Sequence, residues 1–381
     1  MEQVILYIST TLQVPNRSYS SFFPLTLCLL GLLGLVSCSP SNPKAKTIDV
    51  TPLIQQGDLA EAETILQEAL TQHPGQPDLL YNLACVQRRQ KQYSQARSSA
   101  LKVLSFNPGD DQAILLLAQL ELDMGKIQKA WDRLVQLSQQ GRQSAKGQIL
   151  IGSVHAKMGN WIEAEDAFRA ALDLGASTAL AKSSLAFVML KLGQTQSGEQ
   201  WLQEAETAPN QSESSLRQMA ECFLVLGNAQ KAKAIVNQLN PESKSDAQLW
   251  SILGRAELMQ MAFGKAESMF TRAIAAPNST PWNLVEYATM LFAAQREDEA
   301  LQKALEAEKK LNTMPEPINK PSLYNLLATI YARRGQILLA QQYLEQSLQT
   351  DFNQTRVKEL LDKIQKQTAA PIQPQIHSAT P

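Results

Sequence analysis

Residues 250–273 read WSILGRAELMQMAFGKAESMFTRA, and the spacing of small and bulky residues in this stretch decides the fold. Gly254 and Ala266 are small, and the apolar residues around them recur at helical intervals. The place of Ala266 returns along the chain in steps of 34 residues, with a last step of 40: Ala62, Ala96, Ala130, Ala164, Gly198, Ala232, Ala266, Ala300 and Ala340. A fixed period of this length predicts a stacked array of identical helical units.

Each unit carries two helical runs, here called helix A and helix B. With the recurrent alanine numbered position 20 of 34, position 8 is also small: Ala84, Ala118, Gly152, Ala186, Ala220, Gly254, Ala288 and Ala328. Position 15, between the two runs, is glycine in six units: Gly57, Gly125, Gly159, Gly193, Gly227 and Gly335. Small residues at 8 and 20 let the two helices approach closely. The glycine supplies the positive φ that often follows a helix.

This pattern resembles the tetratricopeptide repeat, most fully at Trp250 to Gly254 followed by Ala266, Phe270 and Ala273. The resemblance implies an all-α, right-handed superhelical solenoid of eight to nine helix-turn-helix units. The boundaries that we expect are a signal peptide over 1–37, a lipidated cysteine and tether over 38–46, the solenoid over 47–352, a capping helix over 353–367 and a disordered tail over 368–381.

Three departures from the pattern stand out. The first unit has a polar, proline-bearing segment where helix A belongs and is expected to be a half-unit. Gly198 replaces alanine in the middle of the array at a local cost of about 1 kcal/mol, which favours a tolerated substitution over the alternative of a soft joint. The last step is longer because of the proline-rich insertion at 314–321.

The amino-terminal region predicts that the protein is located in a bacterial envelope. Residues 22–36 are almost unbroken apolar sequence, long enough for a signal-peptide core and short for a membrane span. They end in Leu35-Val36-Ser37-Cys38, which resembles the lipobox of bacterial lipoproteins, with Cys38 as the acylated residue. The resemblance implies a lipid anchor facing the periplasm, and Ser39 favours the outer membrane.

Two alternatives for this region stay open: a cleaved signal without lipidation, and an uncleaved anchor. The long stretch before the apolar core, with Glu2 and only Arg17 as a positive charge, fits a lipoprotein signal poorly. A start codon nearer Arg17 would explain it.

The composition argues for binding rather than catalysis. A net charge of −1 gives no basic excess for nucleic acid. The three histidines, His73, His155 and His377, lie outside metal-binding or catalytic motifs, and no phosphate loop or nucleophile elbow occurs. We therefore expect no enzyme activity, no metal and no cofactor. Cys85 and Cys222 lie four repeats apart, too far for a disulfide in a regular array.

The family resemblance implies that helix A lines a concave groove at positions 2, 5, 9, 12 and 13. The expected groove residues are Tyr81, Arg88, Arg89, Ile149, Phe187, Leu190, Lys191, Leu224 and Trp282. A basic entry and an apolar middle favour a protein or peptide partner with acidic flanks and apolar anchors. The family's carboxylate clamp is not expected, because Tyr81 and Cys85 occupy its lysine and asparagine positions.

These features favour a membrane-anchored scaffold that binds protein or peptide partners during assembly of a pilus, secretion or outer-membrane complex. Two alternatives remain: a repeat lipoprotein of exopolysaccharide export, and the substrate-recognition subunit of an enzyme whose catalytic chain is separate.

Overall fold

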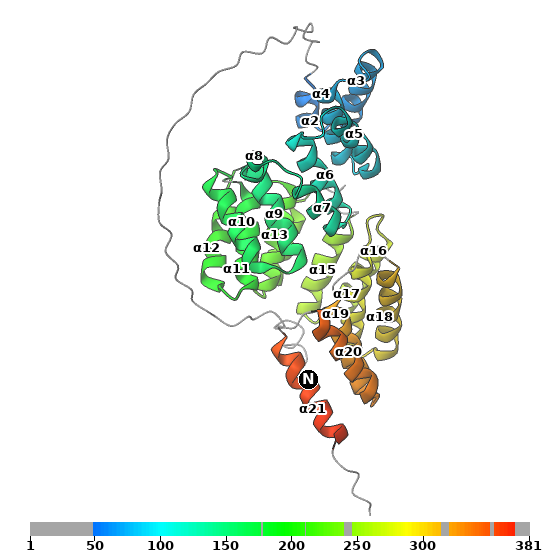
Figure 1. Cartoon of the computed structure of the whole chain (residues 1–381). Coiled ribbons are helices and arrows are strands. Elements are labelled where there is room, and N and C mark those ends of the chain that lie inside the picture. Colours follow the sequence, from blue (N-terminus) through cyan, green and yellow to red (C-terminus); the bar gives the residue numbers. More distant parts are fainter. Residues whose placement is uncertain are drawn as a thin grey trace, which may run out of the picture. The chain divides into compact units, whose positions relative to one another are not determined.

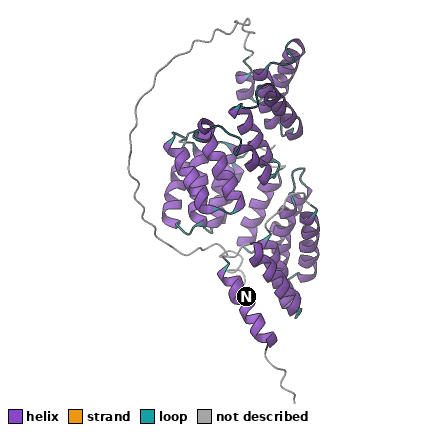
Figure 2. Cartoon of the chain, viewed as in Figure 1, coloured by secondary structure: helices purple, strands orange, loops and turns teal. Residues whose placement is uncertain are grey.

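The computed structural model describes residues 49–176, 178–209, 211–239, 246–313, 320–350 and 354–369. Within these ranges the chain forms twenty α-helices and no strand (Figure 2), which confirms the all-α solenoid class. The described residues fall into two compact units that divide between Gln143 and Ser144. The signal peptide, Cys38, Ser39 and residues 370–381 of the tail lie outside the described residues.

The first unit contains helices α2 to α8 (Figure 1). Their bounds are α2 Thr51–Gln56, α3 Leu59–Gln72, α4 Pro77–Arg89, α5 Tyr93–Phe106, α6 Asp111–Asp123, α7 Ile127–Leu134 and α8 Gln139–Arg142. Helix α2 stands where the first helix A belongs and has only six residues, as its polar sequence predicts. It still packs Leu53 and Ile54 against α3 and α4.

The second unit contains six helical hairpins and one further helix. Their bounds are α9 Ala145–Met158, α10 Trp161–Asp173, α11 Ala179–Lys191, α12 Thr195–Glu206, α13 Glu213–Val225, α14 Ala229–Asn237, α15 Ala247–Met259, α16 Phe263–Ala275, α17 Pro281–Ala293, α18 Glu297–Asn312, α19 Pro321–Arg333, α20 Ile337–Thr350 and α21 Thr355–Ala369. Helix α21 packs Val357 and Ile364 against Ala340 and Leu344 of α20 and covers the last hairpin.

The crossing of helix A and helix B is the tightest contact of every repeat. All eight alanines at position 20 are fully buried, with an exposed fraction of 0%. A larger side chain there would push the helices apart, because protein interiors are packed to crystal density. The period in the sequence is therefore the spacing of these crossings.

Positions 8 and 24 compensate each other in size. Gly152 and Gly254 are the two glycines at position 8, and each lies under a phenylalanine at position 24 of its own repeat. A Cβ added to Gly152 would stand 2.9 Å from Phe168, and one added to Gly254 would stand 2.9 Å from Phe270. Repeats with alanine at position 8 carry alanine, valine or leucine at position 24. The side chains at positions 8 and 24 therefore fill a similar combined space from one repeat to the next.

Gly198 shows the same compensation in size between two facing residues. It is buried in α12, and a Cβ there would lie 2.8 Å from Leu190 and 3.2 Å from the carbonyl oxygen of Ala186. Leu190 therefore occupies the volume that an alanine methyl fills in the other repeats. The missing methyl group of Gly198 is thus matched by the side chain of Leu190, which fills the space.

The turns between helix A and helix B confirm the role of position 15. All six glycines predicted there have positive φ. Three non-glycine residues of the described ranges also have positive φ: Lys91, Met261 and Gln295. Each stands at position 15 of a repeat without the glycine. The turn geometry is thus imposed by the repeat, at a cost of about 1–2 kcal/mol where a side chain is present.

The third repeat keeps the 34-residue period but has a short helix B. Its helix B, α7, stops at Leu134 and is followed by the short α8. After α7, Asp111 of α6 holds Ser138: its Oδ1 accepts the backbone N–H of Ser138 at 2.9 Å, and its Oδ2 accepts the Ser138 hydroxyl. Ser138 then caps α8 by accepting the N–H of Gly141. These bonds replace the last turn of a regular helix B.

In the described ranges, every helix is too short or too polar to cross a membrane.

The size compensation predicts that Gly152→Ala will destabilise the protein by about 1–3 kcal/mol through overpacking against Phe168. Adding Phe168→Leu should recover most of the loss, because leucine stands at position 24 in alanine-bearing repeats. Thermal or urea unfolding measures both changes. Gly264→Ala in α16 is the control, since its added Cβ meets no atom within 4 Å. Additive losses in the double variant would contradict the compensation.

Candidate partner-binding face

The helix A of each repeat in the second unit contributes to one surface, called here the A-helix face. It comprises the outward positions of α9, α11, α13, α15, α17 and α19. Position 9 links two of these helices, because Arg255 of α15 pairs with Glu221 of α13. Of the residues that the sequence assigned to a groove, Ile149, Phe187, Lys191 and Trp282 lie on this face.

An aromatic and cationic cluster lies on α10 and α11. Phe187 is half-buried and meets Trp161 edge to face, with ring centroids 6.2 Å apart. The Lys191 ammonium stands 5.0 Å from the centre of the Phe187 ring. Burial lowers the pKa of Lys191 to about 8, although the nearby Glu221 carboxylate favours the charged amine. Lys191 is thus a cation that the fold holds partly away from water.

A ladder of ion pairs continues from this cluster across the next three helices. Glu221 of α13 accepts from Arg255 of α15 at 2.5 Å, and Arg255 Nε lies 3.4 Å from Glu286 Oε1 of α17. Burial raises the pKa of Glu286. Burial also disfavours the charged form of Arg255, but the carboxylates of Glu221 and Glu286 outweigh this effect and raise the Arg255 pKa above its ordinary value. The ladder is therefore paired within the protein and leaves Lys191 outside it.

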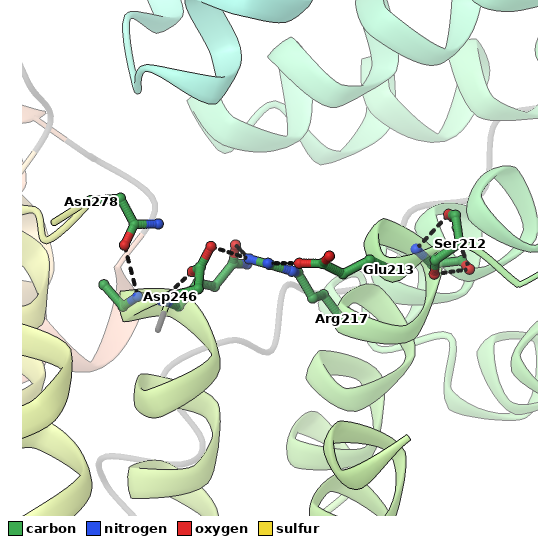
Figure 3. Close-up of polar contacts among 8 residues, drawn as sticks. Ser212, Glu213, Arg217, Asp246 and Asn278 are labelled. Atoms are coloured by element: carbon green, nitrogen blue, oxygen red, sulfur yellow. Dashed lines mark hydrogen bonds and ion pairs between the residues drawn. The ribbon is translucent and has the colours of Figure 1, made fainter. Parts of the chain in front are cut away.

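A second polar network joins α13 to the start of α15 (Figure 3). Arg217 Nη1 lies 3.0 Å from Asp246 Oδ2, and Arg217 also pairs with Glu213 one helical turn away. Burial would raise the pKa of Asp246, but the Arg217 charge lowers it. Asp246 caps α15 by accepting the N–H of Gln248, and Asn278 accepts the N–H of Ala247. Arg217 is thereby committed to holding neighbouring repeats together.

The groove residues predicted in the first unit have mixed roles. Tyr81 of α4 is half-buried, and burial raises the pKa of its hydroxyl. Arg88 forms an ion pair with Asp123 of α6 at 2.9 Å. Arg89 is exposed and donates a long 3.5 Å hydrogen bond to the carbonyl of Ile54. The basic entry expected from Arg88 and Arg89 is therefore half neutralised within the protein.

Four of the predicted groove residues of the second unit differ in accessibility. Ile149 and Trp282 are half-buried and pack against core clusters of their own repeats. Leu190 and Leu224 are 6% and 9% exposed and belong to the core between α11 and α15. These two leucines serve packing, because Gly198 admits the side chain of Leu190. Contact with a partner remains a prediction for the accessible residues.

The sequence assignment missed Arg255, which the structure places at the centre of the ladder. Its position 9, directly after Gly254, was a signal that could have found it. Within the described residues Cys85 and Cys222 are not joined in a disulfide, and Cys222 is buried. In the ranges that the structure describes, His, Cys, Asp and Glu do not cluster as ligands for a metal ion.

Comparison with known families gives three matches to tetratricopeptide repeat models. They cover residues 53–100, 149–213 and 321–354. None of the curated proteins compared with the chain matches it.

Two solved structures share the fold. A crystal structure of the APC/C hetero-tetramer Cut9-Hcn1 aligns over 81% of this chain with a TM-score of 0.59 and 16% identity. The chain spans 60% of that relative's length. The human IFIT1 dimer with PPP-AAAA aligns over 83% of this chain and 80% of its own, with a TM-score of 0.59 and 13% identity. At these identities the likeness establishes the fold alone.

Lys191→Met should be more stable than wild type at pH 7. The difference in free energy of unfolding between the two proteins should be smaller at pH 10. The folded-state pKa of about 8 lies below the ordinary 10.5, so the unfolded chain holds the proton more tightly between these values. Wild-type stability therefore rises with pH across that window, and methionine removes the rise. Urea unfolding at several pH values measures it. Lys265→Met on α16 controls for charge loss at an exposed position. Parallel pH profiles for wild type and Lys191→Met would contradict the desolvated amine.

Proposed function

We propose that this chain, a tetratricopeptide repeat protein, is a membrane-anchored scaffold of a bacterial envelope. Its A-helix face holds a protein or peptide partner and so supports assembly of a pilus, secretion or outer-membrane complex. The anchor is a lipid on Cys38, and the chain itself carries out no catalysis. The stacked repeats are interaction units, since such arrays present extended binding surfaces.

The observation that carries the scaffold role is the cluster at Phe187 and Lys191. Among the described residues no carboxylate forms an ion pair with Lys191, and burying a charged amine in this way costs free energy. A ring and a cation at one surface point match the aromatic and charged groups that concentrate binding energy in interfaces. Retaining such a group is consistent with selection for binding.

The anchor is supported by the sequence before the array. The apolar run over 22–36 and the four residues Leu35 to Cys38 together form a lipoprotein signal. Three acyl chains on one residue exceed the two that stable anchoring needs. The polar residues 39–46 then act as a tether between the membrane and the first repeat.

The anchor predicts that Cys38 is the acylated residue. A full-length chain expressed in a host with lipoprotein processing should incorporate an alkyne fatty acid and sediment with membranes. Cys38→Ala should abolish the label and leave the unprocessed precursor. Cys28→Ala, which lies earlier in the apolar run, is the matched control and should retain it. Equal labelling of the Cys38→Ala chain would exclude this anchor.

The scaffold role predicts that a partner contacts the A-helix face rather than the B helices. A photoreactive phenylalanine analogue placed at Phe187 or Trp282 of the full chain should give one discrete adduct in the native envelope. The same analogue at Ile162 of α10 or Leu338 of α20, which are 66% and 71% exposed, should not. Adducts from the B-helix positions alone would place the partner on the opposite surface.

A further inference from the structure

Three helices of the second unit meet at one guanidinium group, which two carboxylates share unequally. Glu221 of α13 lies 2.5 Å from Arg255 Nη2, whereas Glu286 of α17 lies 3.4 Å from Arg255 Nε. The Nε–H is buried, and no described atom of the protein accepts a hydrogen bond from it. Glu286 therefore feels the positive charge without the hydrogen bond that strengthens a close ion pair.

Two other arginines of this unit also lie between two carboxylates, and their contacts are shorter. In all four contacts the nitrogen and oxygen atoms are 3.0 Å apart or closer: Arg217 with Glu213 and Asp246, and Arg296 with Glu267 and Glu299. The hydrogen bonds from Arg296 lower the pKa of Glu267 and of Glu299. Burial raises the pKa of Glu286 instead, so Glu286 is the carboxylate that its arginine holds least well.

The surroundings of Glu286 explain why its negative charge is disfavoured. Burial opposes the carboxylate, and the like charge of Glu221 adds to this effect; together they outweigh Arg255 and the hydrogen bond from Ser251, both of α15. Within the described helices, no other cation lies within 4.0 Å of the Glu286 carboxylate. Charged groups of the other helices that pack on α17 are paired elsewhere: Glu267 of α16 with Arg296, and Glu297 of α18 with Arg333 of α19.

We propose that the ladder of Glu221, Arg255 and Glu286 is an acid-responsive coupling between repeats, in which uptake of one proton by Glu286 tightens the packing of α13, α15 and α17. The step is a protonation of the carboxylate by the medium. Glu221 alone then neutralises Arg255, so the ladder changes from two negative charges and one positive charge to one of each. This inference concerns the array itself and is independent of the partner that it binds.

The direction of the effect follows from where the proton is held more tightly. The folded chain binds a proton at Glu286 more strongly than the unfolded chain, in which the carboxyl group titrates near its ordinary pKa of 4.5. The stabilisation is complete below that pH, and it is lost as the pH rises through the raised pKa of the folded protein. This part of the array is accordingly tighter in mild acid than at pH 7.5.

Hydrogen exchange of the full-length chain, followed by mass spectrometry, tests the proposal. Glu286→Gln keeps the shape of the protonated carboxyl group and carries no charge at any pH. At pH 7.5 we expect the amides of α15 in this variant to exchange severalfold more slowly than in wild type. The two proteins should converge as the pH falls towards 4.5. Rates are compared at the same pH, so that the intrinsic pH dependence of exchange cancels.

A second background distinguishes the shared arginine from burial of a lone acid. Glu221→Gln removes the like charge and leaves Glu286 as the one described carboxylate paired with Arg255. Adding Glu286→Gln to this variant should speed exchange in α15 at pH 7.5, because Arg255 then has no carboxylate partner. The effect of the same substitution thus reverses its sign.

Glu299→Gln is the matched control. Glu299 is also a second carboxylate on an arginine, but its side chain is 52% exposed and lies 2.6 Å from Arg296. This substitution should not slow exchange at pH 7.5.

Two results would overturn the proposal. One is equal exchange of α15 in wild type and Glu286→Gln at every pH. The other is faster exchange in Glu286→Gln at pH 7.5, whether in α15 alone or in all helices, which would show that the ionised carboxylate stabilises the ladder.

Discussion

The close crossing of helix A and helix B is the contact on which the rest of the structure depends. Alanines with no exposed surface at position 20 bring the two helices together in every repeat except that of Gly198. Because interiors tolerate little change in volume, a larger residue on one side requires a smaller one on the other. The Gly152–Phe168 and Gly254–Phe270 pairs satisfy this constraint by combining the smallest residue found at position 8 with the largest found at position 24. The repeats are thus equal in volume although they differ in sequence.

Polar contacts between repeats add a second level of order. Arg217 with Asp246, Glu221 with Arg255 and Arg255 with Glu286 each connect one helix A to the next. These pairs are partly buried, and removing one partner would leave an uncompensated charge. They connect neighbouring A helices and engage Arg217 and Arg255 of the A-helix face.

Two lysines of the A-helix face, Lys191 and Lys157, stand apart from these ion pairs. Both are at position 13 of their repeats, and both escape the ion-pair ladder that begins at Glu221. Lys191 is held over Phe187 with its pKa lowered to about 8, so the fold keeps it available at a free-energy cost. A scaffold gains from such groups because binding energy concentrates at a few desolvated anchors surrounded by inert contacts.

The sequence by itself determined the period, the helical hairpin and the glycine turns, because these depend on residue size and backbone freedom repeated at fixed intervals. It also indicated Phe187 and Lys191, since position within a repeat decides which side of helix A a residue occupies. Tertiary structure alone decided which of these residues are accessible. Leu190 is buried because Gly198, on another helix, leaves it room, and Arg88 is paired because Asp123 lies one repeat away. The segment after α7 is held by Asp111 of α6, which is distant in sequence and accepts the N–H of Ser138. Each of these outcomes depends on a contact between helices, which no local pattern of residues encodes.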